Sequence, residues 1–168
     1  ANFAIFTGSY DQMKQIAERI RKAAEDLGVK RIVVGECGHA WRVAYNFWNT
    51  LIGPFDFLDQ NYPIPQHICE FTHDLIRQDK LTLDPSKNDH MTLTFHDSCN
   101  VARASRMGED PGGQFTYPRE IIKAVCNNFV DMAAETIHEN TFCCGGGGGL
   151  LTDDLVELRV KGAKPRME

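Results

Sequence analysis

The chain has 168 residues, enough for a single domain over residues 1–168 with a buried core. Its 42% hydrophobic and 24% charged residues are typical of a globular protein and exclude a disordered chain. The formal net charge of −5, without a Lys/Arg cluster or an apolar run long enough to cross a bilayer, argues against a nucleic-acid partner and a membrane span. Because the sequence starts at Ala1 and ends in a charged stretch, we expect a piece of a longer protein.

The N-terminal part of the chain has the pattern of a strand–helix–strand unit. Residues 2–7 are mostly apolar and predict a short strand. Ser9 and Gln12 have the spacing of a capping box, and apolar residues then recur at helical spacing up to Gly28. The β-branched run at 31–35 predicts a second strand. Because such a unit forms a parallel pair, we expect an α/β fold with a Rossmann-like parallel sheet flanked by helices.

The rest of the chain alternates helical patterns with one more strand. Apolar residues at helical spacing predict helices over 40–51 and 66–80. Alternating side chains predict a strand over 91–95, followed by a short helix, a loop rich in Gly and Pro over 107–117, and a further helix. A last helix is expected to begin at Thr152, whose hydroxyl can cap it.

The cysteines are the feature of the composition that needs an explanation. The six are Cys37, Cys69, Cys99, Cys126, Cys143 and Cys144. A chain of this length with long helical patterns does not need the disulfide bonds that stabilise small secreted proteins. We therefore expect reduced thiols that hold a metal or do redox chemistry. Cys69 lies in a predicted helix and Cys126 at the end of one, and packing explains both most simply.

Two cysteine-bearing segments have the surroundings of a reactive site. Residues 96–99 (HDSC) directly follow a predicted strand, at the end where α/β sheets place their chemistry. Cys143 and Cys144 are adjacent and run into the glycines of residues 145–149. Glycine lets the backbone approach a bulky inorganic cluster, and its amides stabilise negative charge on sulfur. The pattern therefore favours a loop rich in Cys and Gly that holds an iron–sulfur cluster.

Two other interpretations of this loop are weaker. A phosphate-binding loop needs a Lys-Ser/Thr pair after the glycines, or a complete GxGxxG unit, and the sequence has neither. A zinc site typically uses C-x-x-C pairs, which are also absent. Adjacent cysteines suit a cluster of several irons better than one tetrahedral ion.

Together these segments resemble a known family. Residues 95–99 (FHDSC) and 142–147 (FCCGGG) resemble the cysteine-rich CCG domain of the heterodisulfide reductase family. Residues 36–42 (ECGHAWR) and 126–129 (CNNF) resemble more closely the K subunit of the membrane complex that works with dissimilatory sulfite reductase. The resemblance covers nearly the whole chain.

The resemblance implies a [4Fe–4S] cluster, non-cubane in some members, held by a cysteine, the CCG pair and a downstream C-x-x-C pair. By position it implies metal ligands Cys37, Cys99, Cys143 and Cys144, cofactor-binding glycines Gly145, Gly146 and Gly147, and catalytic residues Cys37, His39 and His96. For His96, anchoring of its loop is the alternative. The sequence has no C-x-x-C pair, so we also consider that this chain alone lacks the cluster.

The function implied by the resemblance is a heterodisulfide-reductase-like oxidoreductase that passes electrons to a protein disulfide or trisulfide in dissimilatory sulfur metabolism. The implied partners are the small sulfur-carrier protein of dissimilatory sulfite reductase, membrane quinol-oxidising subunits and other iron–sulfur subunits. They would hold the protein at the cytoplasmic face of the membrane. The alternative is a non-catalytic electron-relay module without a substrate site.

Overall fold

The structure is a computed structural model that describes residues 4–5, 7–35, 37–146, 148 and 152–168. Its helices are α2 (Tyr10–Asp26), α3 (Gly38–Val43), α4 (Asn49–Ile52), α5 (Ile68–Arg77), α6 (Thr116–Val125) and α7 (Val156–Met167). Its strands are β1 (Val33–Val34), β2 (Gln66–His67), β3 (Arg106–Met107) and β4 (Asp110–Pro111). A π-helical turn, Ala44–Trp48, joins α3 to α4, and 3₁₀ turns lie at Pro85–Asn88, Ala134–Thr136, His138–Asn140 and Asp153–Leu155.

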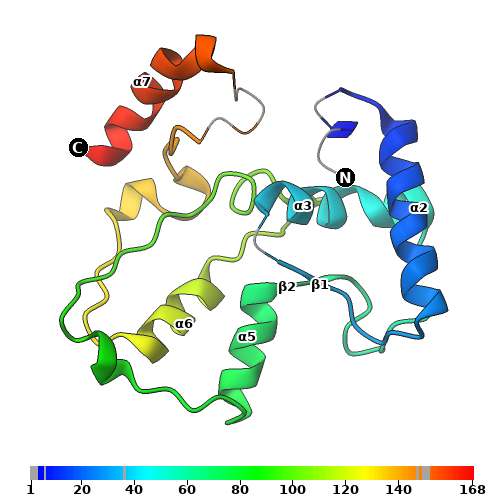
Figure 1. Ribbon diagram of the computed structural model, residues 1–168, viewed down its shortest axis with the longest axis horizontal. Helices are drawn as coiled ribbons and strands as arrows, with labels where there is room; N and C mark the ends of the chain where they lie inside the picture. The colour runs from blue at the N-terminus through cyan, green and yellow to red at the C-terminus, as the bar shows by residue number, and fades with distance from the viewer. Residues whose placement is uncertain (1–3, 6, 36, 147, 149–151) are drawn as a thin grey trace.

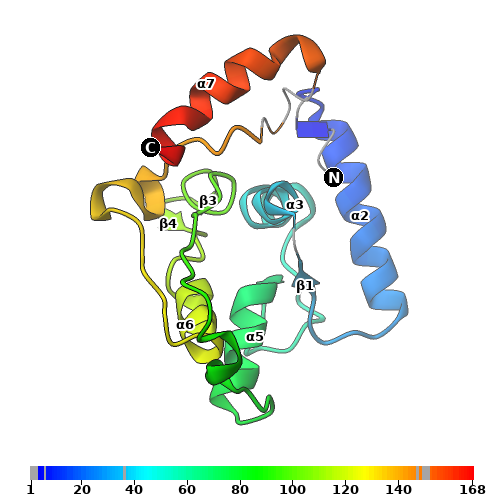
Figure 2. The same ribbon diagram turned by 60° about the vertical axis from the view of Figure 1, so that its left-hand side comes forward.

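The helices lie around the short strands and α3. Figure 1 shows α2 along one side of the molecule, α5 and α6 side by side at the bottom, and α7 at the upper left. In the view of Figure 2, α5 and α6 remain neighbours, and α7 lies at the opposite end of the molecule from them. None of the helices in the described ranges is both long and apolar enough to cross a membrane.

The sheets are much smaller than the sequence predicts. Strands β1 and β2 pair in parallel, with Val33 opposite Gln66, and their connection runs through α3 and α4. Strands β3 and β4 form an antiparallel hairpin, and a single parallel bridge joins Leu93 to Phe129. The parallel pair predicted between residues 2–7 and 31–35 is therefore wrong for the described residues, because the parallel partner of β1 is β2. The described residues form no full Rossmann-like sheet.

The missing sheet has an identifiable cause at the N-terminus. Of the strand predicted over 2–7, the structure describes Ala4, Ile5 and Thr7. Ala4 and Ile5 are helical, and none of these three described residues pairs with β1. The other residues of 2–7 lie outside the described ranges. The partner of β1 is instead the start of the segment predicted as a helix over 66–80, whose first two residues are extended.

Most predicted helices are confirmed, with local corrections. Ser9 Oγ accepts the Gln12 amide at the start of α2, and Gly28 follows its end with φ +64°. The predicted helix over 40–51 is built from α3, the π-helical turn and α4. The expected short helix after residue 99 is a set of turns, and the loop at 107–117 contains part of the β3–β4 hairpin. The Thr152 side chain caps no amide.

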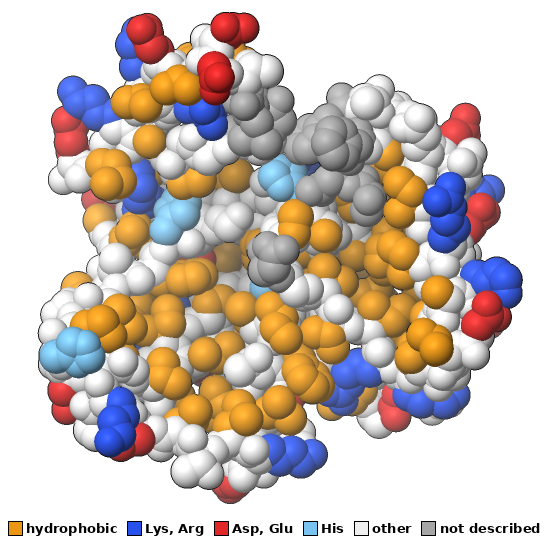
Figure 3. Space-filling view, in the orientation of Figure 1, with side chains coloured by type: hydrophobic (Ala, Val, Ile, Leu, Met, Phe, Trp, Pro, Cys, Tyr) orange, Lys and Arg blue, Asp and Glu red, His pale blue; other side chains and the backbone are white. Residues whose placement is uncertain are grey.

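The two halves of the chain are held together differently. Buried apolar side chains in the N-terminal half form the core; they are Ala4, Met13, Ala17, Val43, Ala44, Trp48, Phe55 and Leu58. The C-terminal half contributes none of these residues; it buries Ala102 and Cys126 and also has the polar contacts described below. Figure 3 shows hydrophobic side chains across the middle and lower part of one face, with charged side chains around its rim.

Candidate metal centre

Gly38 brings the first predicted site segment against the second. A Cβ on Gly38 would lie 3.1 Å from Val101 Cγ2 and 3.2 Å from Ser98 Oγ, which is tighter than ordinary contact. The lack of a side chain therefore lets the start of α3 lie against the turn that carries Cys99. Cys37 and His39, which flank Gly38 in the sequence, are thereby placed beside this turn.

His39 connects this pair of segments to the glycine loop. Its Nε2 lies 3.1 Å from Asn100 Nδ2 and 3.3 Å from the carbonyl oxygen of Gly148. The imidazole tautomer decides whether Nε2 accepts from the amide or donates to the carbonyl. A Cβ on Gly148 would overlap His39 Nε2, so a side chain there would require the imidazole or the loop to move. Asn100 also directs Nδ2 toward Cys99 Sγ at 3.8 Å.

The adjacent cysteines are exposed thiols that accept backbone hydrogen bonds. Gly145 N donates to Cys143 Sγ at 3.3 Å, and Gly146 N donates to Cys144 Sγ at 3.4 Å. Such amides stabilise a thiolate or a cluster sulfur. The predicted role of Gly145 and Gly146 thus has a geometric basis, whereas Gly147 lies outside the described residues.

Helix α7 packs against the loop that carries Cys143 and Cys144. Gly145 has φ +75°, and a Cβ there would lie 2.8 Å from Ala163 Cβ and 2.9 Å from Arg159 O. A Cβ on Gly162 would lie 3.6 Å from Cys143 Sγ. Small residues on both sides therefore allow the loop to lie directly on α7.

The predicted ligands are only partly assembled. Among the described residues, no three His, Cys, Asp or Glu side chains are grouped closely enough to hold a metal ion. The donor chemistry does fit an iron–sulfur cluster, because Cys99, Cys143 and Cys144 are free thiols and two of them accept backbone amides. The structure thus brings together the segments that carry the four predicted ligands, but their described side chains do not form a complete set of metal ligands.

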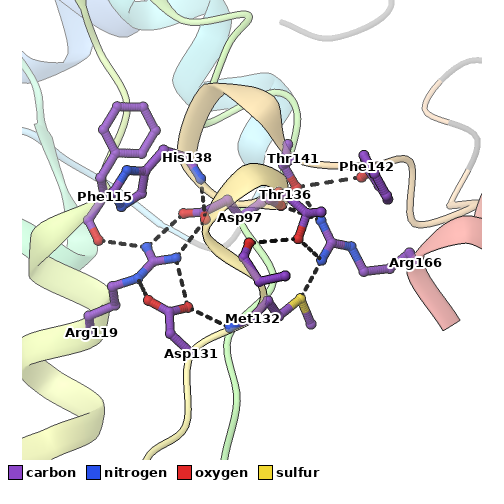
Figure 4. Close-up of polar contacts among 11 residues, drawn as sticks. Asp97, Phe115, Arg119, Asp131, Met132, Thr136, His138, Thr141, Phe142 and Arg166 are labelled. Atoms are coloured by element: carbon purple, nitrogen blue, oxygen red, sulfur yellow. Dashed lines mark hydrogen bonds and ion pairs between the residues drawn. The ribbon is translucent and has the colours of Figure 1, made fainter. Parts of the chain in front are cut away.

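A buried ion pair fixes the segment that carries Cys99 (Figure 4). Asp97 is 4% exposed and accepts two hydrogen bonds from Arg119, at 2.9 Å from Nη1 and 2.7 Å from Nη2. Arg119 also donates to Asp131 through Nε at 2.5 Å and to Phe115 O at 2.8 Å. These hydrogen bonds, chiefly the one to Asp97, raise the pKa of Arg119, and the Arg119 hydrogen bond lowers the pKa of Asp131. Arg119 therefore stays charged and holds the Asp131 carboxylate ionised.

Asp97 also connects this segment to the stretch of chain that leads into Cys143. The backbone amide of His138 donates to Asp97 Oδ2 at 2.7 Å, and Thr141 Oγ1 donates to Asp97 O at 2.7 Å. From α7, Arg166 donates to Thr136 O at 2.5 Å, and its guanidinium lies over the Phe142 ring (Figure 4). The two predicted cysteine segments are thus joined through one aspartate.

Sequence reasoning missed Arg119, Asn100 and Arg166 as residues that organise the site. The signal for Arg119 was a charged residue in a helix that is otherwise apolar on its inner side. The signal for Asn100 was only its position next to Cys99. Arg166 had no signal beyond its place in the last predicted helix.

His96 lines a mostly apolar cavity of about 230 Å³, which Gly38 and Ser98 also line. Both ring nitrogens are buried and have no hydrogen-bond partner among the described residues. Burial, and then the charge of Arg166, lower the pKa of His96, while Asp97 acts in the opposite direction. The ring is therefore neutral near pH 7. Cys69, predicted as a core residue, is half-buried and lines the same cavity.

Cys126 is 1% exposed, which confirms its predicted place in packing. Its Sγ lies 3.9 Å from the carbonyl oxygens of Asn88 and Met91, so the thiol points into the protein. Cys126 is therefore a packing residue, unlike the exposed pair Cys143 and Cys144.

Comparison with known proteins agrees with the motif analysis. Residues 93–166 match the CCG family, described as a cysteine-rich domain. The iron–sulfur subunit of the Hdr-like menaquinol oxidoreductase of Archaeoglobus profundus is 39% identical over 99% of this chain, which covers 33% of that subunit. The iron–sulfur subunit 2 of the Archaeoglobus fulgidus enzyme is 38% identical with the same coverage.

A third relative comes from Methanosarcina mazei. It is a subunit of the dihydromethanophenazine:CoB–CoM heterodisulfide reductase, and it is 30% identical over 91% of this chain and 35% of its own length. The chain spans about a third of the length of these relatives. No solved structure matches it. Residues 93–166 are therefore similar to the cysteine-rich CCG domain, and the chain is similar along nearly its whole length to iron–sulfur subunits of heterodisulfide-reductase-like oxidoreductases.

Proposed function

We propose that the chain is the part of a heterodisulfide-reductase-like subunit that holds an iron–sulfur cluster, with Cys99, Cys143 and Cys144 as ligands and Cys37 as a ligand or reactive thiol. The observation that carries this proposal is the convergence of three segments, in which Gly38 lies on the turn of Cys99 and His39 lies between Asn100 and Gly148. The iron–sulfur subunits among the relatives support the cluster, and its [4Fe–4S] type is part of the proposal.

The proposed reaction is the reduction of a disulfide-type substrate. Cleavage of a disulfide to two thiols takes up two electrons and two protons, and a cluster supplies electrons one at a time. The amides of Gly145 and Gly146 stabilise negative charge on Cys143 and Cys144. His96 is neutral and has no hydrogen-bond partner for its ring nitrogens among the described residues, so its ring can accept a proton from solvent and pass it to a leaving thiolate. His39 positions the glycine loop.

The proposed substrate is a protein disulfide or trisulfide of dissimilatory sulfur metabolism, carried by the small sulfur-carrier protein of dissimilatory sulfite reductase. The resemblance of residues 36–42 and 126–129 to the K subunit supports this choice. Electrons would come from quinol-oxidising membrane subunits through other iron–sulfur subunits, in keeping with a relative named as a menaquinol oxidoreductase subunit. The proposal includes a location at the cytoplasmic face of the membrane through these partners.

The test is iron and acid-labile sulfide per chain after anaerobic reconstitution. We expect about four irons in a version extended to the length of the relatives, and fewer in the 168-residue chain. Cys143→Ser should lose most of the iron, whereas Cys126→Ser, at a buried cysteine outside the site, should retain it. Iron absent from the extended protein, or unaffected by Cys143→Ser, would refute the proposal.

The same loaded protein separates a reductase from an electron-relay module. Reduced enzyme is mixed with a disulfide-bonded carrier peptide, and released thiols are counted. Release of two thiols per two electrons supports the reductase. A loaded cluster that is reduced and reoxidised without thiol release would favour the relay.

A further inference from the structure

A second cavity, of about 420 Å³, lies between the loop before β2 and the chain that follows β4. Four of its lining residues are aromatic, namely Trp41, Tyr45, Tyr62 and Tyr117. None of its described lining residues is a predicted metal ligand or catalytic residue of the candidate metal centre. It therefore needs an explanation of its own.

The cavity is built from fixed contacts. Trp41 Nε1 donates to Gly112 O at 2.9 Å, and the Trp41 and Tyr45 ring centroids are 5.1 Å apart. A Cβ on Gly112 would lie 2.5 Å from the Tyr45 ring, so the chain after β4 reaches this wall only because residue 112 is glycine. The wall is thus set by packing in the protein, before any ligand arrives.

Two buried acceptors on the lining have no hydrogen-bond partner. Gln66 is 4% exposed and Gln114 is 8% exposed, and among the described residues neither Oε1 atom is paired. Gln66 Nε2 donates to Asp74 Oδ2 at 3.0 Å, which fixes the orientation of its carboxamide. An unpaired buried acceptor is unfavourable, because it has lost its hydrogen bonds to water without replacement. A ligand that brings hydrogen-bond donors would remove this cost.

The negative charge available on the lining favours a cationic hydrogen-bond donor as the ligand. Glu70 is the charged side chain among the described lining residues, and its burial raises the pKa of its carboxyl. A cation in the cavity would favour the ionised carboxylate. The Arg31 guanidinium already covers one face of the Tyr62 ring, 3.3 Å from its centroid, and its charge acts to lower the pKa of Glu70. A ligand's guanidinium would therefore stack on the other rings of the wall.

We propose that this cavity binds a guanidinium group, whose plane stacks on the aromatic walls while its N–H groups donate to Glu70 and to the side-chain oxygens of Gln66 and Gln114. A guanidinium offers five donors in one plane and an apolar face, which matches separated acceptors between rings. An ammonium has three donors and no such face. A carboxylate would bring more acceptors to a lining that already has unpaired ones. The group comes from an arginine side chain of a partner protein or from a free alkylguanidine.

Binding to the full chain can be measured by calorimetry and by NMR of the Trp41 indole. The probes are N-butylguanidinium, n-butylammonium and butyrate, which share a chain and differ in the head group. We expect N-butylguanidinium to bind most tightly, with a shift of the Trp41 indole signal. Glu70→Gln should weaken its binding about tenfold or more, because a charged hydrogen bond is lost. Glu18→Gln, at an exposed glutamate on α2, should leave it unchanged.

A second variant guards against misfolding. Gln114→Met keeps the volume but removes the buried acceptor, so it should stay folded by circular dichroism and bind N-butylguanidinium more weakly. A capped arginine amide that binds more tightly than N-butylguanidinium identifies the ligand as a protein side chain, and the reverse order identifies a free guanidine. Equal binding of butyrate, or unchanged affinity in both variants, would overturn the proposal. Neither result depends on a cluster, so failure here leaves the proposed function standing.

Discussion

Asp97 and Arg119 form a buried bidentate ion pair in the C-terminal half of the chain. Asp97 follows directly after His96 in the motif that carries Cys99, and Arg119 projects from α6. The same aspartate accepts from the chain that leads into Cys143. The C-terminal half contributes nothing to the main apolar core cluster, and a charge pair joins its two cysteine segments.

Removing Arg119 should destabilise the protein strongly. Arg119→Met leaves the Asp97 carboxylate buried without its partner, and breaking a buried pair costs about 3–5 kcal/mol. The free energy of unfolding from urea titration is the measurement. The matched control is Arg106→Met, which removes an exposed pair with Glu139 and should cost about 1 kcal/mol or less. Similar losses in the two variants would show that the buried pair has no special role.

His67 should make the protein less stable at acid pH. Burial lowers the pKa of His67 to about 4, and its neutral Nδ1 accepts the amide of Cys69 at 3.2 Å. The unfolded chain, with a histidine pKa of about 6.5, binds the proton more readily than the folded one. Stability is therefore full above about pH 6.5 and falls as the pH drops toward 4, by about 3 kcal/mol.

The measurement is the free energy of unfolding between about pH 4 and 7. His67→Gln should flatten the fall over this range, whatever its effect on stability at pH 7. His90→Gln, at an exposed histidine, should leave the slope as in the wild type. A slope that does not change in His67→Gln would contradict the assignment.

The helices were predictable because each has its information nearby in the sequence. Ser9, Gln12 and Gly28 mark the ends of α2 through local hydrogen bonds and a positive φ. The sheet was harder, because strands depend on partners far along the chain. Val33 and Val34 are strand-like by themselves, but their partner at Gln66 sits at the start of a helical pattern.

The site was predictable in its residue types and only partly in its geometry. The pattern of Cys99, Cys143 and Cys144 singles out the cysteine segments without any structure. The contacts that bring them together run through Arg119 and Asn100, whose partners lie tens of residues away or on another loop. Such pairs leave no periodic signal in one sequence.

Gly148→Ala should disturb the junction between the glycine loop and α3. Its Cβ would overlap His39 Nε2, so the ring or the loop must move, at a cost of about 1–3 kcal/mol. The NMR signals of the His39 ring should shift, and the free energy of unfolding should fall. Gly35→Ala is the control, because its Cβ would meet no atom within 4 Å. An unmoved His39 signal in Gly148→Ala would mean that the loop does not lie on this histidine.

The cysteines should differ in their rate of alkylation in the absence of a cluster. Cys143 and Cys144 are exposed, so iodoacetamide can reach their sulfur atoms. Cys126 is buried and should react only when the protein opens. Mass spectrometry of peptides after brief labelling measures each site, with labelling in urea as the reference for equal exposure.

Because iron would occupy Cys143 and Cys144 in the proposed centre, reconstitution should slow their labelling and leave Cys126 as slow as before. Labelling of Cys143 and Cys144 that is as slow as that of Cys126 in the metal-free chain would contradict the exposed placement of the pair, and labelling unchanged by reconstitution would contradict their role as ligands.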